Sequence, residues 1–235
     1  MQKFVAISLF AVAAAAGCVA PDEVDNKVII VHNVPPGEGC SVEASEDTYM
    51  ASGQLDVQSG RGYYLTPLLK NFASSDGGRL EEQRIFFATG ADVSLAFIRS
   101  SQLDTAFSVN FSSTVTPDGG LAATAFDIMP PALMPMLRTA IAPGDENDDT
   151  VVATVQVFGD QGGQALVTRP FSYPIRLCNG CSRQSLGLCT ALPEGFEGRI
   201  SGGVCSPFQD GFVQCCTTST GFELCPAAPE DIVTP

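Results

Sequence analysis

Apolar and polar residues alternate along most of the chain between residues 27 and 177. In the stretch AFSVNFSSTV, Phe107, Val109 and Phe111 fall on one side of an extended chain, and polar residues fall on the other. A period of two is typical of a strand with one buried face. Similar alternating or continuously apolar runs bring the predicted number of strands to about nine, at residues 28–31, 54–58, 63–69, 84–88, 93–97, 107–115, 122–128, 151–157 and 171–177.

Turn sequences such as PPGEG, SDGG, PDGG and GDQGG separate these runs. Many short strands with glycine-rich turns, and almost no helical period, predict an all-β fold, an antiparallel immunoglobulin-like sandwich. A closed barrel is the alternative. Pro170 and Pro174 lie on the polar face of the last strand and have no N–H to donate, so we expect an edge strand there. The irregular residues 129–141 predict a short helix or a crossover between sheets.

The N-terminus has the pattern of an export signal. Lys3 precedes the apolar stretch Phe4–Ala16, and Gly17 and Cys18 follow. A positive start, a short apolar run and small residues are typical of a signal peptide rather than of a structural helix. The tetrapeptide AAGC resembles the lipobox of bacterial lipoproteins, in which small residues precede a cysteine that becomes the mature N-terminus. The resemblance implies that residues 1–17 are a lipoprotein signal peptide and that Cys18 is lipidated.

Lipidation would make Cys18 a membrane anchor, because two or more acyl chains hold a protein where one chain does not. Residues 18–26 are acidic and without period, and they predict a flexible tether. Lipoproteins retained in an inner membrane often carry Asp after the cysteine, whereas this chain has Val19, so the resemblance implies the outer membrane. The alternative is ordinary secretion, with cleavage after Ala16 or Ala20.

The cysteines change the picture of the C-terminal part. Seven of the nine cysteines lie in the 48 residues from 178 to 225, where strand patterns fade; they are Cys178, Cys181, Cys189, Cys205, Cys215, Cys216 and Cys225. This density predicts a disulfide-rich module at residues 178–235 after a β-sandwich at residues 27–177. A zinc ribbon built on the motif CNGC is the alternative, although a second Cys-x2-Cys half-site is missing.

Seven cysteines cannot all pair among themselves. If Cys18 carries lipid and the other eight cysteines are oxidised, Cys40 must bond to one of the seven. Sequence alone leaves 105 connectivities open. We expect Cys178 or Cys181 as the partner of Cys40, because these two lie nearest to the sandwich. We also expect the adjacent Cys215 and Cys216 to have different partners.

Charge and composition exclude some function classes. The net charge is −14, and the chain has three lysines, Lys3, Lys27 and Lys70. Binding to a phosphate backbone needs clustered lysine and arginine, so we expect no nucleic-acid partner. His32 is the single histidine, and no catalytic motif occurs. The sequence therefore predicts a protein that is not an enzyme.

Two weaker ligand signals remain. Asp145, Asn147 and Asp149 alternate oxygen ligands as a calcium loop does, but Thr150 and Gln156 exclude a full EF-hand. A looser calcium site and a solvated acidic turn are the two interpretations. Three methionines could form an adaptable binding patch or cap the core; they are Met129, Met134 and Met136.

The segments GQLDV with YYLTPLLKN, FSYPIRLCNGC and FQDGFVQCC resemble segments of uncharacterised exported bacterial lipoproteins that join a β-rich body to a Cys-rich end. The resemblance implies no activity. Together these patterns predict a non-catalytic, lipid-anchored envelope protein at the outer membrane, with a structural, adhesive or ligand-presenting role. The expected partners are the membrane, through the lipid, and a protein or polysaccharide at the surface. The alternatives are an envelope polysaccharide hydrolase and a secreted binding or inhibitory module.

Overall fold

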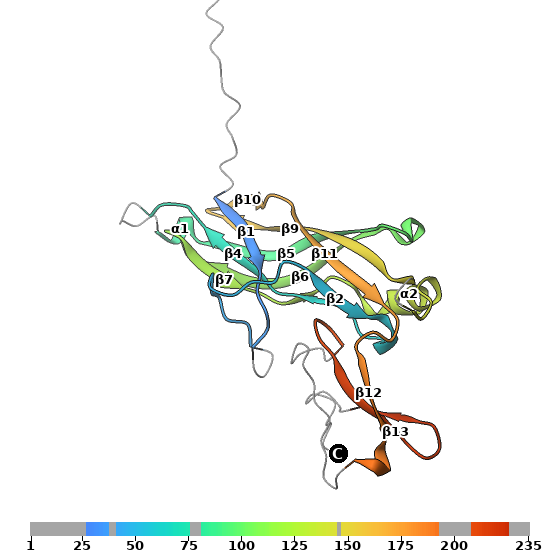
Figure 1. Cartoon of the computed structure of the whole chain (residues 1–235). Coiled ribbons are helices and arrows are strands. Elements are labelled where there is room, and N and C mark those ends of the chain that lie inside the picture. Colours follow the sequence, from blue (N-terminus) through green and yellow to red (C-terminus); the bar gives the residue numbers. More distant parts are fainter. Residues whose placement is uncertain (1–26, 38–40, 76–80, 145–146, 193–207, 226–235) are drawn as a thin grey trace, which may run out of the picture.

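The largest β-sheet of the body contains most of the strands that the alternating runs predict. A computed structural model describes residues 27–37, 41–75, 81–144, 147–192 and 208–225 (Figure 1). The larger sheet has the strand order β2-β11-β9-β5-β6, with β10 paired to β9. Its strands are β2 (Gly53–Asp56), β5 (Phe86–Phe97), β6 (Thr105–Val115), β9 (Asp149–Gln161), β10 (Gln164–Val167) and β11 (Phe171–Cys178).

The smaller sheet has the order β1-β4-β7, with both pairs antiparallel. A further short pair joins β3 to β8. The strands concerned are β1 (Val28–Asn33), β3 (Tyr64–Leu65), β4 (Pro67–Asn71), β7 (Gly120–Ala123) and β8 (Phe126–Asp127). The short helices of the body are α1 (Glu81–Arg84), α2 (Met134–Ala140), η2 (Val57–Ser59), η3 (Ser101–Leu103) and η4 (Pro131–Leu133).

Both sheets bury their apolar faces in one hydrophobic core. Val28 and Leu69 come from the smaller sheet, and Val93 and Val155 come from the larger one. Leu137 of α2 belongs to the same core. Each fully buried side chain of this size contributes about 1.5–3 kcal/mol relative to an exposed one, so the alternation in the sequence determines which face of each sheet turns inward.

The expectation of a short helix at residues 129–141 is confirmed by η4 and α2. Among the described residues, no helix is long and apolar enough to cross a membrane. The runs at residues 84–88 and 93–97, which we expected as two strands, form the single strand β5. A register shift between Ala88 and Gly90 joins the two runs.

The expectation of an edge strand at Pro170 and Pro174 is wrong, since β11 lies between β9 and β2. The pairing with β2 starts at Ile175, after the second proline. Neither proline therefore has to donate a hydrogen bond toward β2. The pair β2 and β11 is also parallel, so the sheet is not purely antiparallel as expected.

The Cys-rich region, residues 178–235, is called the terminal module below, and residues 27–177 are called the body. The described part of the terminal module contains a sheet of three short strands, in the order β12-β13-β14. These are β12 (Arg183–Leu188), β13 (Val213–Thr217) and β14 (Glu223–Leu224), with the helical turn η6 (Cys189–Ala191) between the first two. The pair β12 and β13 is parallel, and the pair β13 and β14 is antiparallel.

Candidate functional site

The body and the terminal module meet along β2. Leu55 of β2 forms an isolated antiparallel bridge with Gln209. The N–H of Asp56 donates to the carbonyl of Phe208 over 3.1 Å, and the N–H of Asp210 donates to the carbonyl of Gln54 over 2.9 Å. The segment Phe208–Asp210 therefore extends the larger sheet beyond β2 and covers that edge.

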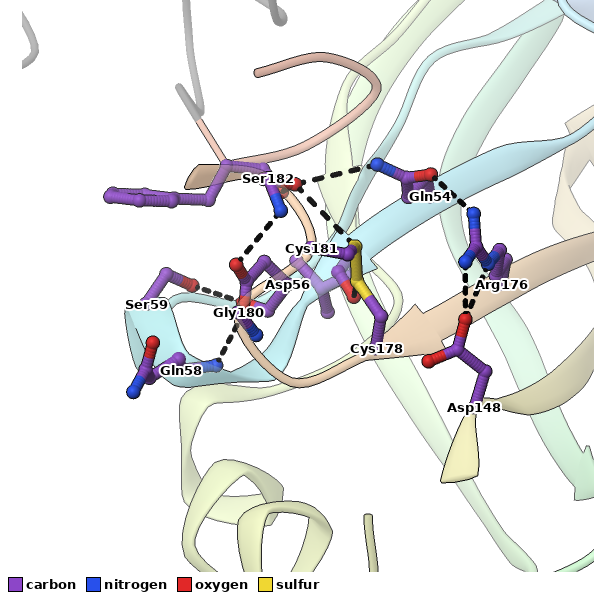
Figure 2. Close-up of a disulfide and its surroundings, with 12 residues drawn as sticks. Gln54, Asp56, Gln58, Ser59, Asp148, Arg176, Cys178, Gly180, Cys181 and Ser182 are labelled. Atoms are coloured by element: carbon purple, nitrogen blue, oxygen red, sulfur yellow. Dashed lines mark hydrogen bonds and ion pairs between the residues drawn. A yellow bond between two sulfur atoms is a disulfide. The ribbon is translucent and has the colours of Figure 1, made fainter. Parts of the chain in front are cut away.

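The carboxylate of Asp56 organises the first turn of the terminal module. Asp56 is fully buried, and its oxygens accept hydrogen bonds from the N–H groups of Gln58, Gly180 and Ser182 at 3.0, 2.9 and 3.1 Å (Figure 2). Gly180 has a φ of +92°, which glycine adopts without strain. The loop CNGC is thus folded around a carboxylate that belongs to the body.

The same loop carries a disulfide between Cys178 and Cys181 (Figure 2). The expectation that Cys40 bonds to one of these two cysteines is therefore wrong. Nearness in sequence to the body was a poor guide, because the turn held by Asp56 brings the two cysteines of CNGC together. The terminal module is closed by two further disulfides, Cys189–Cys216 and Cys215–Cys225, so the expectation of different partners for the two adjacent cysteines is confirmed.

Six of the eight cysteines expected in disulfides are thus paired with one another. The remaining two, Cys40 and Cys205, lie outside the described residues, as does Cys18. If the eight are fully oxidised, the thiol count now leaves Cys205 as the partner of Cys40. This bond would join the body to the terminal module, as the parity of the sequence requires.

A chain of buried and part-buried hydrogen bonds also runs from β1 to the terminal module. The side-chain amide of Asn33 donates to the hydroxyl of Tyr173 over 3.2 Å, and the hydroxyls of Tyr173 and Tyr63 lie 3.2 Å apart. Tyr63 donates to the carboxylate of Asp210, with a shortest distance of 2.9 Å. A Cβ at Gly53 would lie 2.1 Å from the hydroxyl of Tyr63, so glycine is needed where β2 passes this chain.

Burial shifts the acid–base behaviour of this chain. Desolvation, reinforced by the nearby Asp210, raises the pKa of Tyr63, and desolvation also raises the pKa of Tyr173. Desolvation raises the pKa of Asp210, although its hydrogen bonds with Gln54, Gln209 and Tyr63 oppose the shift. The tyrosines are therefore held as neutral hydrogen-bond donors, which suits a structural connection.

An open cavity of about 560 Å³ lies at this junction. Arg176 projects from β11 at the cavity, where its Nε donates to Asp148 over 2.6 Å and its Nη1 lies 3.4 Å from the side-chain oxygen of Gln54 (Figure 2). The lining is mixed in character and is formed by Met50, Ser52, Gly53, Gln54, Arg176, Cys181, Asp210, Gly211 and Phe212. A cavity that combines polar groups with exposed apolar side chains can bind a ligand without catalysing a reaction.

The calcium hypothesis gains no support from Asp149. This side chain is buried, and its oxygens accept hydrogen bonds from the N–H groups of Arg99, Ser100 and Thr150 at 2.9, 2.9 and 2.7 Å. Asn147 donates through its side chain to the carbonyl of Pro143, and Asp145 lies outside the described residues. A calcium site at these three positions stays a prediction.

The other candidate residues have structural surroundings. His32 is in β1, with Nε2 3.4 Å from the carbonyl oxygen of Ser45. Met129 and Met134 are buried in the core, whereas Met136 is exposed, so the three methionines do not form one patch. Ligand atoms of Cys215, Glu223 and Cys225 lie within 4.8 Å of one another, but the two sulfurs are joined in a disulfide and offer no thiolate for a metal.

Sequence reasoning missed Asp56, Asp210 and the two tyrosines. Asp56 had a local signal, because an aspartate just before a short turn often accepts the N–H two residues later, as it does here from Gln58. Asp210 had no such signal, since its partners Gln54 and Tyr63 lie about 150 residues earlier in the chain.

Comparison with known proteins adds little to this geometry. The sequence matches no protein-family model and no curated protein. One solved structure that resembles the chain is that of a protein from Archaeoglobus fulgidus, with 12% sequence identity and a TM-score of 0.35. The similarity covers 55% of this chain and 94% of the archaeal chain.

Peptide mapping of the oxidised protein tests the thiol count. We expect non-reducing digestion and mass spectrometry to recover one peptide pair joined by Cys40 and Cys205, together with the three disulfides described above. A free thiol at either position, or a different partner for Cys40, would contradict this assignment.

Substitution of the central carboxylate tests the role of Asp56. We expect Asp56→Asn to lower the free energy of unfolding by about 1–3 kcal/mol, because its amide group would face buried N–H donors. Chemical denaturation followed by circular dichroism measures the loss. The exposed Asp47→Asn makes the same chemical change and should stay within about 0.5 kcal/mol of the parent protein; equal effects of the two substitutions would refute the role.

The raised pKa of Asp210 predicts a pH dependence of a definite sign. Because the folded-state pKa lies above the unfolded value, protonation of Asp210 favours the folded state. The stability of the parent protein should therefore rise relative to that of Asp210→Asn as the pH falls from about 7 to about 4. Denaturation series of both proteins across this range measure the difference, and a constant or falling difference would show that the assignment is wrong.

Proposed function

We propose that this protein is a non-catalytic protein of the bacterial envelope that is anchored by lipid in the outer membrane. It holds its terminal module away from the membrane and presents the module to a partner. The anchor is the lipid on Cys18, and the tether is residues 18–26. The partner is a protein or a polysaccharide at the surface. This proposal combines the lipobox-like N-terminus with the position of the terminal module on the body.

The positions of the two ends of the body support the proposal. The chain enters the body at Val28, the first residue of β1, and the terminal module lies beyond the opposite end, past β2 (Figure 1). A membrane anchor that precedes Val28 would thus leave the terminal module on the far side of the body. This arrangement suits presentation of the module.

The bonding of the polar groups at the junction supports binding rather than catalysis. The carboxylate of Asp210 accepts hydrogen bonds from Tyr63, from the side chain of Gln209 and from the N–H of Gln54. Arg176 forms an ion pair with Asp148. A general acid or base must exchange a proton with a substrate, whereas these groups are engaged within the protein.

We also propose that the body is an immunoglobulin-like sandwich. Two sheets over one core, joined by mostly antiparallel pairs, support an immunoglobulin-like sandwich. In such folds recognition commonly uses the loops at one end of the sheets. The junction with the terminal module occupies one end of the body, which makes this end the expected binding surface.

Detergent phase separation and surface proteolysis test the proposal together. We expect the parent protein to enter the detergent phase and Cys18→Ala to stay in the aqueous phase, because the substitution removes the acylated thiol. Intact-mass measurement of the mature parent protein should show the added acyl chains. As a matched control, Cys205→Ala also removes one thiol and should still partition into detergent.

Protease added to intact cells then tests presentation. We expect cleavage of the terminal module in cells that carry the parent protein, with a periplasmic protein as the control for envelope integrity. A parent protein that is free of lipid and partitions like Cys18→Ala would refute the anchor. A lipidated protein that stays protected until the outer membrane is opened would refute surface presentation.

A further inference from the structure

The edge of the larger sheet at β2 is covered by another segment of the chain, whereas the edge at β6 is not covered by any described residue. At one edge, the segment Phe208–Asp210 of the terminal module covers β2. At the other edge, β6 pairs with β5, and the described residues provide no second strand for it. An uncovered edge strand presents a row of N–H and C=O groups that can pair with another chain.

The sequence of β6 lacks the charged residues and prolines that normally prevent such pairing, and its one register shift against β5 falls after Asn110, beyond residues 105–109. The strand covers 11 residues, TAFSVNFSSTV, without a charged residue or a proline. Proteins usually protect a free edge with lysine, with proline, with a bulge or by keeping the strand short. A long neutral strand of high β propensity is therefore a surface suited to pairing.

The apolar residues of β6 are also incompletely covered. Phe107 lies opposite Val93 of β5, and Val109 lies opposite Ala91. The two residues of β5 are buried, whereas Phe107 and Val109 pack against the same core but stay partly exposed. One more strand beside β6 would cover the apolar surface that this edge leaves in water.

We propose that β6 pairs antiparallel with β6 of a second copy of this chain, which joins the two larger sheets into one continuous sheet. A two-fold axis at Phe107 places this ring opposite its own copy and Thr105 opposite Val109. Residues opposite each other in an antiparallel pair share a face, so the core-facing side chains of both copies stay on the same side. The strand is thus self-complementary, as a two-fold interface requires.

Charge favours a second copy over a basic partner. The chain carries a net charge of −14, so two copies repel each other over most of their surface. β6 adds no charge of its own to that repulsion, and the nearby carboxylate of Asp92 on β5 accepts a hydrogen bond from Ser108 over 2.6 Å. A basic protein would instead be drawn to clustered carboxylates, and the residues of β6 themselves include none.

Sedimentation velocity over a concentration series tests the pairing on the exported full chain with Cys18→Ala, so that lipid does not hold copies together. We expect a reversible dimer. The double variant Ala106→Lys/Ser108→Lys places lysines opposite each other across the axis and should raise the dimer dissociation constant by about tenfold or more, or about 1.4 kcal/mol. The matched control Ser94→Lys/Ala96→Lys adds the same charges to the exposed face of β5 and should leave the constant unchanged.

Hydrogen exchange on the protein without the lysine substitutions supplies a second measurement that does not depend on how the variants fold. Within residues 105–109, we expect the alternate amides that point away from β5 to gain protection as the concentration rises through the dimer transition. A monomer at every concentration, a dimer that the edge variant does not weaken, or a dimer without this protection would overturn the proposal. Protection that appears only when envelope extract is added would assign the edge to another protein and would also overturn it.

Discussion

Two carboxylates, those of the fully buried Asp56 and the half-buried Asp210, hold the terminal module against the body, and the arrangement of these two parts depends on them. A carboxylate away from water costs several kcal/mol unless hydrogen bonds compensate for its lost hydration. Asp56 compensates with three N–H groups, one from Gln58 of η2, one from Gly180 in the loop CNGC and one from Ser182, the residue that follows the loop. Asp210 does so with Tyr63, Gln209 and the N–H of Gln54. Each carboxylate therefore requires residues from both parts of the chain.

The three disulfides of the terminal module differ in how much they stabilise it. Cys178 and Cys181 are three positions apart, whereas Cys189 and Cys216 are 27 apart. In the chain-entropy account, the longer loop gives about twice the stabilisation of the shorter one. The short bridge closes a turn that Asp56 already holds, while the two other disulfides replace the core that three short strands cannot supply. The contact between the terminal module and the body thus depends on the two carboxylates, whereas the internal structure of the terminal module depends on its disulfides.

The strands were predictable because alternation reflects a local property, the burial of one face. Phe107 and Val109 of β6 illustrate this, since every second residue of that strand turns toward the core. The neighbours of each strand were not predictable, because pairing joins distant segments, as between β2 and β11. The chain of hydrogen bonds from Asn33 to Asp210 could not be predicted from the sequence for the same reason. Nearness in sequence gave the wrong partner for Cys40, whereas the cysteine count, which does not depend on geometry, now leaves Cys205 as its predicted partner.

The terminal module and the strand β6 are related because they lie at opposite edges of the larger sheet. A sheet that ends on both sides in free backbone groups has two surfaces open to association. The segment Phe208–Asp210 closes one of them from within the chain, and the hydrogen bonds of Asp210 keep that closure in place. At the opposite edge the described residues provide no covering segment, β6 itself has no charged residue, and Phe107 stays partly exposed. In a protein of net charge −14, the absence of charged residues along the 11 residues of β6 is the property that pairing between like-charged copies requires.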